Sequence, residues 1–230
     1  MLSRVLPAHV AVAESYADLP RARLHPEEHG LAGTFRAQRR AEFTTVRHCA
    51  RRAGRSLGLP PFPLLPGDTG APLWPAGVVG SLTHCRGYRG AAVAHAADVR
   101  SLGIDAEPHV PLPDGMLERI ALPEELRHQE ALRSWDGSVS WDRLLFCVKE
   151  AVYKAWSPLT GHWLGFHEAS VLIQRSPPVF TARLLRAAPD GCEVPQVLVG
   201  RWHAQDGLLL AALAVRHRGR TPLGTAAVRH

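Results

Sequence analysis

The two lysines of this 230-residue chain both lie in the segment 146–156, whereas the remaining 25 of its 27 lysines and arginines are arginines. Lys149 directly precedes Glu150, and Lys154 follows it by four residues. A lysine ammonium is a compact charge that can bind a phosphate and release a proton, whereas a guanidinium keeps its proton. In a helix, Glu150 and Lys154 share one face, and Lys149 and Tyr153 form the adjoining row. The segment is therefore either a phosphate-binding site or a helix with an ordinary surface ion pair.

A second candidate site is the alternating segment 99–108, which reads as a strand. Gly103, Asp105 and Glu107 would share one face of it, with the two carboxylates about 7 Å apart. Like charges at that spacing are unfavourable without a cation, and Mg²⁺ accepts carboxylate oxygens. Gly103 would leave room for a ligand on the same face. The alternative is a strand end with two solvated acids.

A third candidate is the end of the apolar segment 78–88, where Ser81, Thr83, His84 and Arg86 follow one another closely. Hydroxyl, imidazole and guanidinium groups at one strand end can hydrogen-bond phosphate oxygens. The alternative for His84 is a hydrogen-bonded structural histidine.

The elements that must position these groups follow from hydrophobic periodicity and from turn residues. The proline- and glycine-rich segment 59–77 is expected to be a loop. Helices are predicted at 36–57, 117–120, 124–132 and 141–156. Strands are predicted at 78–84, 90–95, 99–107, 170–173, 181–185, 197–202 and 208–215.

A weak internal repeat predicts two related halves. Gly80, Gly87 and the run 91–94 recur 120 residues later as Gly200, Gly207 and the run 211–214. We therefore expect an α+β fold in which two similar halves pack together, with residues 1–110 forming the first half and 111–215 the second. Residues 216–230 are expected to form a flexible tail.

The charge balance indicates a polyanionic partner. The formal net charge is +6 and the isoelectric point is about 9.7, which fits nucleic acid, a phosphorylated cofactor or an acidic protein. The four cysteines have neither metal-ligand nor redox spacing, so free thiols are expected. No signal peptide and no apolar run of membrane length is recognisable. These features predict a cytoplasmic protein that does not bind membranes.

The three candidate sites, in this order and spacing, resemble the 4'-phosphopantetheinyl transferase superfamily of the surfactin- and enterobactin-synthase type. The matching segments are Trp74-Pro75-x-Gly77-Val78-Val79-Gly80-Ser81-Leu82-Thr83-His84-Cys85, Gly103-Ile104-Asp105-Ala106-Glu107, and Trp141-Asp142-x4-Cys147-Val148-Lys149-Glu150-Ala151-x-Tyr153-Lys154-Ala155-Trp156. The resemblance extends from about residue 36 to residue 215.

The resemblance implies a pseudo-twofold α+β fold with coenzyme A and Mg²⁺, or Mn²⁺, bound between the halves. It implies transfer of 4'-phosphopantetheine from coenzyme A to a serine of an acyl or peptidyl carrier protein, with release of adenosine 3',5'-bisphosphate. Such carrier proteins serve polyketide, fatty acid and nonribosomal peptide synthesis. A monomer that binds no nucleic acid is expected.

By the same resemblance, the metal ligands would be Asp105, Glu107 and Glu150. Glu150 is also the candidate general base for the serine, and Lys154 would assist the leaving phosphate. Asp105, Glu150 and Lys154 are thus the candidate catalytic residues.

The resemblance also assigns residues to coenzyme A. Lys149, Lys154, Thr83 and His84 would face its phosphates. Arg39 and Arg47, on the early helix, would hold the adenosine 3'-phosphate end.

One departure from the family pattern concerns the loop before Gly67. Relatives often carry a lysine where this chain has Pro66. Arg51, Arg52 or Arg55 could replace the missing charge.

Two other readings use the same residues. A metal-dependent phosphodiesterase or nuclease could employ the three acids, but it gives the segment 81–85 no task. A non-enzymatic nucleic-acid-binding protein would fit the isoelectric point, but the arginines are spread along the chain and no nucleic-acid-binding motif is recognisable.

Overall fold

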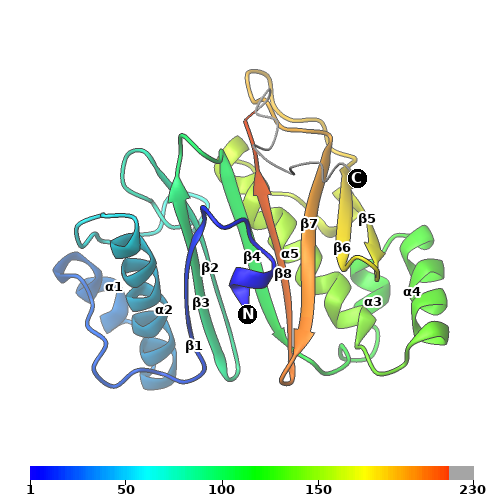
Figure 1. Ribbon diagram of the computed structural model, residues 1–230, viewed down its shortest axis with the longest axis horizontal. Coiled ribbons are helices and arrows are strands. Elements are labelled where there is room, and N and C mark those ends of the chain that lie inside the picture. The colour runs from blue at the N-terminus through cyan, green and yellow to red at the C-terminus, as the bar shows by residue number, and fades with distance from the viewer. Residues whose placement is uncertain (218–230) are drawn as a thin grey trace, which may run out of the picture.

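The computed structural model describes residues 1–217, which form two antiparallel sheets side by side with helices packed on them (Figure 1). Apart from Arg216 and His217, the predicted C-terminal tail lies outside the described residues. The mixture of helices and antiparallel sheets confirms the predicted α+β class. Within residues 1–217, no helix has the length and apolar character needed to cross a membrane.

The N-terminal sheet has three strands in the order β1-β3-β2. The strands are β1 (Ala11–Ser15), β2 (Val78–Cys85) and β3 (Tyr88–His95). The helical elements of this part are η1 (Leu2–Arg4), η2 (Pro26–Glu28), α1 (His29–Gly33) and the long helix α2 (Ala37–Ser56), which packs on β1 and β3. The sequence predicted α2, β2 and β3, but it gave no signal for β1.

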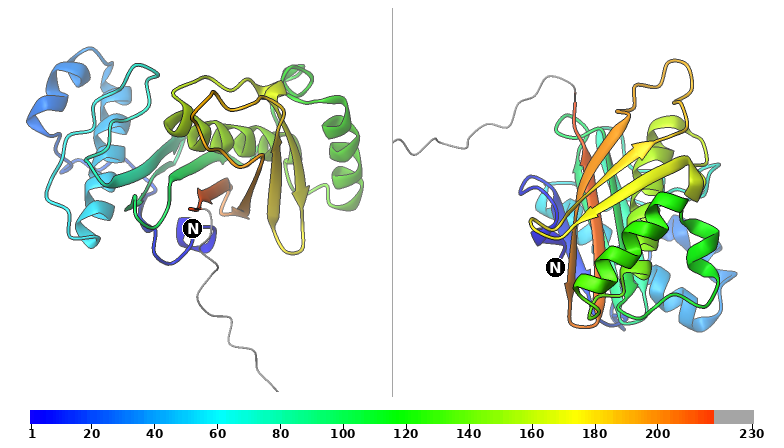
Figure 2. Two further views of the ribbon diagram at one scale, coloured as in Figure 1. Left: turned by 90° about the horizontal axis from the view of Figure 1, so that it is seen from above. Right: turned by 90° about the vertical axis from the view of Figure 1, so that its right-hand side faces the viewer.

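The second sheet has five strands in the order β4-β8-β7-β6-β5. The strands are β4 (Ser101–Pro108), β5 (Ala169–Gln174), β6 (Val179–Leu184), β7 (Val197–Gln205) and β8 (Leu208–Val215). The helices are α3 (Met116–Ile120), α4 (Pro123–Trp135), α5 (Trp141–Thr160) and η3 (Phe166–Glu168). Helix α5 packs on β4 and β8, and Figure 2 shows the N-terminal segment on the opposite face of the sheet.

The predicted repeat is confirmed by the strand register. Gly80 pairs with Val93 in the first sheet, and Gly200 pairs with Leu213 in the second, so both members of the pair keep the offset of 120. The turns that follow contain glycines with positive φ, Gly87 at 81° and Gly207 at 75°, a conformation that favours glycine. The order β1-β3-β2 with helix α2 corresponds to β4-β8-β7 with helix α5.

Strand β4 joins the two sheets. One of its edges pairs with β8 along its length. At the other edge, the Ile104 amide donates to Ser81 Oγ at 3.1 Å and the Ala106 amide donates to Thr83 Oγ1 at 3.0 Å. Hydroxyl groups of β2 therefore satisfy backbone donors that a bare sheet edge would leave unpaired. The predicted division at residue 110 assigns β4 to the first half, whereas its strand pairing is with the second sheet.

Gly103 brings helix α5 close to β4. A Cβ atom at this position would lie 1.9 Å from the carbonyl oxygen of Ala151. The expectation that Gly103 leaves room for a ligand is therefore wrong, because the helix backbone fills that space. The close approach instead places the side chains of α5 directly beside the carboxylates of β4.

Candidate active site

Asp105 lies at the junction of β2, β4 and α5, where elements of both halves meet. Its Oδ1 accepts hydrogen bonds from Lys154 Nζ at 2.7 Å and from Thr83 Oγ1 at 3.1 Å. Its Oδ2 is buried and has no hydrogen-bond partner among the described residues. A buried carboxylate oxygen without a partner is costly, which indicates that a ligand completes the site.

The Asp105 carboxylate affects the pKa values of the other two predicted metal ligands, Glu107 and Glu150. Burial and then the Asp105 carboxylate raise the pKa of Glu107. Burial raises the pKa of Glu150, and Asp105 adds to this effect while Lys154 opposes it. Burial works to lower the pKa of Lys154, but Asp105 and Glu150 outweigh it and the pKa is raised. The junction therefore concentrates negative charge, which the Lys154 ammonium and the Arg143 guanidinium offset.

The residues present fit a magnesium ion that is coordinated partly by the protein and partly by a substrate. Among residues 1–217, no three His, Cys, Asp or Glu side chains form a ready-made metal cage. Mg²⁺ usually takes only one or two protein carboxylates, together with substrate phosphates and water. The free Oδ2 of Asp105 is suited to that role. Glu107 is held by Arg143, whose Nη1 donates to Oε2 at 3.1 Å.

A cavity of about 350 Å³ opens next to this junction, and most of the predicted phosphate-binding residues meet there. Its charged and titratable lining residues come from α2, β2 and α5: Arg39, Arg47, His84 and Lys154. Its apolar walls include Phe35, Phe43 and Leu82. The cavity thus combines basic groups with apolar surface, as a nucleotide requires.

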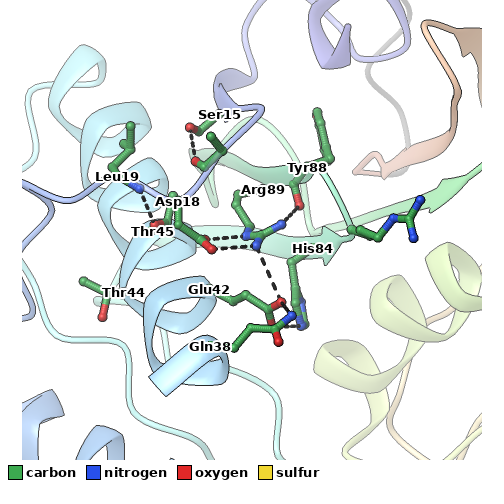
Figure 3. Close-up of polar contacts among 12 residues, drawn as sticks. Ser15, Asp18, Leu19, Gln38, Glu42, Thr44, Thr45, His84, Tyr88 and Arg89 are labelled. Atoms are coloured by element: carbon green, nitrogen blue, oxygen red, sulfur yellow. Dashed lines mark hydrogen bonds and ion pairs between the residues drawn. The ribbon is translucent and has the colours of Figure 1, made fainter. Parts of the chain in front are cut away.

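Arg39 and His84 contact each other through Nη1 and Nε2, although they are far apart in the sequence. Burial, followed by the charge of Arg39, lowers the pKa of His84 to about 4. The imidazole is therefore neutral at pH 7. Figure 3 shows that Glu42 and Arg89 lie beside it.

Arg47 lines the same cavity but is anchored more firmly. Its Nε and Nη2 donate to the carbonyl oxygen of Leu64 at 3.1 and 3.0 Å. Its guanidinium carbon lies 3.3 Å from the centroid of the Phe43 ring. Burial lowers its pKa to about 10, so the charge is kept at neutral pH. The bonded guanidinium presents a fixed positive charge to the cavity.

Lys149 is not brought to this cavity. Its ammonium lies 2.9 Å from Glu125 Oε2, and it donates to the carbonyl oxygens of Phe166 at 2.6 Å and Ala169 at 2.9 Å. Its side chain is only 2 % exposed. Protein oxygens therefore use the hydrogen-bonding capacity of the Lys149 ammonium. None of these contacts leaves it facing the cavity where a phosphate was expected.

Thr83 is also buried, and its hydroxyl is used within the protein. It donates to Asp105 and accepts from the backbone of β4, as described above. Thr83 therefore supports the carboxylate and is absent from the lining of the cavity among the described residues.

The position of Pro66 is at the cavity, where it forms part of the wall. The arginines proposed to replace the lysine of relatives lie elsewhere. Arg51 pairs with Glu28 at 2.9 Å, and Arg52 donates to the carbonyl oxygen of Glu14 at 2.8 Å. Neither residue, nor Arg55, is among the described residues that line the cavity.

Sequence reasoning missed three participants. Arg143 lies two helical turns before Glu150, and Glu42 lies about one turn after Arg39. Helical spacing from the predicted site residues could therefore have identified both. Trp163 packs on Tyr153 beside Glu150, with ring centroids 4.5 Å apart and the ring planes tilted by 51°, and it is 64 % exposed. Its position in a loop gave no signal.

Comparison with known families covers most of the chain. Residues 27–94 match the 4'-phosphopantetheinyl transferase N-terminal domain, and residues 101–204 match the 4'-phosphopantetheinyl transferase superfamily. The two matches fall on either side of the connection between β3 and β4. No match supports a phosphodiesterase, a nuclease or a nucleic-acid-binding protein.

Three characterised relatives align over nearly their whole length. The chain is 48% identical to 4'-phosphopantetheinyl transferase Svp of Streptomyces mobaraensis, with 98% of this chain and 92% of the relative covered. It is also 48% identical to PptT of Mycobacterium tuberculosis, with 94% and 98% covered. Identity to Npt of Nocardia iowensis is 45%, with 93% and 99% covered. With these matches, the chain belongs to the 4'-phosphopantetheinyl transferase superfamily.

Proposed function

We propose that this enzyme transfers 4'-phosphopantetheine from coenzyme A to a serine of an acyl or peptidyl carrier protein. The assignment of roles rests on one observation: a buried carboxylate oxygen and a basic cavity lie side by side at one junction. Asp105 presents a free buried oxygen there, and the basic cavity of Arg39, His84 and Lys154 opens beside it.

In the reaction, the serine hydroxyl oxygen attacks the phosphorus atom that carries pantetheine. The new Ser–O–P bond forms as the pyrophosphate P–O bond breaks, and the bond electrons leave with adenosine 3',5'-bisphosphate. Such reactions need positioning of the groups and stabilisation of charge on the phosphate oxygens.

We assign Asp105, Glu107 and Glu150 as the residues that would hold Mg²⁺ or Mn²⁺. When bound, the ion would offset charge on the pyrophosphate oxygens. In its absence, burial raises the pKa values of Glu107 and Glu150, and repulsion from the Asp105 carboxylate adds to this effect. The site is therefore suited to a cation and a phosphate arriving together.

Glu150 is our candidate general base for the serine proton. Its pKa is raised by burial, which strengthens it as a base relative to an exposed glutamate. Metal binding would weaken the basicity of Glu150. We therefore assign Asp105 and Glu107 as the principal metal ligands. This division of labour is the part of the proposal that mutagenesis must test first.

Lys154 is suited to act on the leaving phosphate. Its ammonium bonds Asp105 and also lines the basic cavity, so it lies between the carboxylates and the expected phosphates. It would donate a hydrogen bond, or its proton, to the departing oxygen. Arg39, His84 and Arg47 would hold the phosphates of the adenosine end.

The carrier protein would approach a molecule of net charge +6. Carrier proteins usually present an acidic recognition helix, so electrostatic attraction would speed association. The association rate should therefore fall as salt is added. We expect the enzyme to act as a monomer, because both halves of the site are in one chain.

The direct test is mass spectrometry of an apo carrier protein incubated with the enzyme, coenzyme A and Mg²⁺. We expect a gain of one phosphopantetheine group, no gain when the carrier serine is replaced by alanine, and no gain when the metal is chelated. Failure to modify several acyl and peptidyl carrier proteins would overturn the proposal. Cleavage of simple phosphodiesters without a carrier would favour a phosphodiesterase.

A further inference from the structure

Arg39 and His84 contact each other, but both side chains are partly exposed, so a further group is needed to fix the pair for phosphate binding. Arg39 lies in the first turn of α2 and its side chain is 47% exposed, whereas His84 is at the end of β2 and is 36% exposed. Exposed long side chains sample many rotamers, and fixing them costs conformational entropy. At neutral pH the contact between Arg39 Nη1 and the uncharged His84 Nε2 is a hydrogen bond from the guanidinium to the imidazole, without an ion pair between them.

Glu42 lies against both groups. Its Oε2 is 3.6 Å from Arg39 Nη1 and 3.8 Å from His84 Nε2, and its side chain is only 16% exposed. It follows Arg39 by three residues in α2, so the two side chains share a helix face. Glu42 is the single acid of that helix, and it lies at the point where α2 meets the end of β2.

A buried arginine, Arg89, pairs with Glu42 and helps to fix its position (Figure 3). Arg89 Nη2 lies 3.5 Å from Glu42 Oε1, and its side chain is 6% exposed. Arg89 is held in turn by Asp18, through Nε at 2.8 Å and Nη2 at 3.0 Å. Ion pairs thus run from Asp18 in the loop after β1, through Arg89 on β3, to Glu42 and Arg39 on α2, and Arg39 contacts His84 at the end of β2.

The contacts of Glu42 are loose enough to leave Arg39 and His84 available. The distance of 3.6 Å between Glu42 Oε2 and Arg39 Nη1 exceeds that of an ordinary hydrogen bond, so Glu42 attracts the Arg39 charge without taking up the other N–H groups of the guanidinium. The neutral His84, 3.8 Å from the same oxygen, is held through its contact with Arg39. A carboxylate that bonded them tightly would compete with an incoming phosphate. Glu42 can therefore orient the pair while a substrate phosphate takes the hydrogen bonds.

We propose that Glu42 is a positioning residue that holds Arg39 and His84 as a two-donor clamp for a phosphate of coenzyme A. The proposal rests on the function proposed above. Glu42 touches neither the carboxylates of β4 nor Lys154 in any described contact, so its effect should fall on substrate binding.

The charges around His84 give a readout that a purely structural residue would not move. Arg39 on α2, Lys154 on α5 and Arg89 on β3 all act to lower its pKa, and Glu42 alone acts to raise it. Loss of the Glu42 charge should therefore lower the pKa of His84 further. Nuclear magnetic resonance titration of the His84 ring can measure this shift.

The test uses Glu42→Gln, which keeps the shape and removes the charge, in the full-length enzyme. We expect the KM for coenzyme A to rise roughly tenfold, since misplaced contacts weaken binding, while kcat stays within about twofold. Isothermal titration with coenzyme A, without any carrier protein, should show the same loss of affinity. Glu42→Asp should restore part of it. Glu27→Gln, an exposed acid at η2 that is 59% exposed, should behave as wild type.

A double-mutant cycle distinguishes positioning from folding. In a background of Arg39→Gln and His84→Gln, the further change Glu42→Gln should have no effect on coenzyme A affinity, because its targets are gone. An equal loss in both backgrounds would overturn the proposal. So would an unchanged KM, or a fall in kcat alone. If wild-type enzyme binds coenzyme A but modifies no carrier, the proposed function fails while the binding test of the clamp still stands.

Discussion

Helix α5 carries its two lysines into different surroundings. Lys149 points into the interior of the second half, where Glu125 and two carbonyl oxygens bind it. Lys154 points to the junction between the halves, where it contacts Asp105 and lines the basic cavity. Five residues place them roughly 140° apart around the helix axis. Two identical side chains on one helix can therefore have separate tasks, one in folding and one at the site.

The largest expected effect is at the junction face. Glu150→Gln should lower kcat by about 10²–10⁴-fold, the range typical of general acid–base catalysis. Coenzyme A binding and thermal stability should change little, because no described hydrogen bond depends on this carboxylate. Single-turnover assays with an apo carrier protein would measure the loss. Near-normal turnover would remove Glu150 from the role of base.

Substitution of Lys149, which points into the interior, should lower the unfolding free energy. Lys149→Met leaves Glu125 buried without its cation, which should cost about 3–5 kcal/mol of unfolding free energy. Urea denaturation measures this loss, and turnover per folded molecule should stay close to wild type. Adding Glu125→Gln should recover part of the stability. If turnover is lost while stability is kept, Lys149 faces phosphate after all, as its sequence position first suggested.

A smaller change at Lys154 separates charge from proton transfer. Lys154→Arg keeps the positive charge, so coenzyme A should still bind, but a guanidinium does not release a proton. We expect kcat to fall roughly tenfold, equivalent to about 1.4 kcal/mol of transition-state stabilisation. An unchanged kcat would mean that charge alone is needed at the junction.

A further prediction concerns the pH dependence of stability. The pKa of His84 is about 4 in the folded chain, against 6.5 for an ordinary histidine. Between these values the unfolded chain binds a proton that the folded chain does not, so the unfolding free energy should fall as the pH is lowered from about 6.5 toward 4. His84→Gln should flatten this part of the profile. Identical slopes for both proteins would contradict the assigned shift.

Much of the scaffold could be read from local patterns. The helices α2 and α5 and the strands β2, β3, β4 and β8 lie within a few residues of their predicted bounds. The reason is that periodicity 2 or 3.6 and glycine-rich turns are properties of short segments. Strand β1 was missed because Ala11–Ser15 is short and contains only one β-branched residue, Val12, of the kind that favours strands.

The candidate site was predictable in composition and only partly in geometry. Arg39, His84 and Lys154, which the resemblance assigned to coenzyme A, line one cavity. The position of Lys149 was not predictable, because its partner Glu125 lies on α4 and the carbonyls of Phe166 and Ala169 follow the next loop. Such partners are distant in sequence, and no local pattern connects them to the lysine.

The amino-acid sequence specifies which chemical groups this protein has and the order in which they occur. It also determined the repeat, because glycine turns and alternating strands reappear 120 residues apart. Which of these groups come into contact depends on the packing of the helices and strands. Gly103 admits the backbone of α5, and this contact sets Lys154 against Asp105 while it directs Lys149 into the core. The physical reason is that burial and charge pairing depend on neighbours from other elements, which the packing of the two halves brings together.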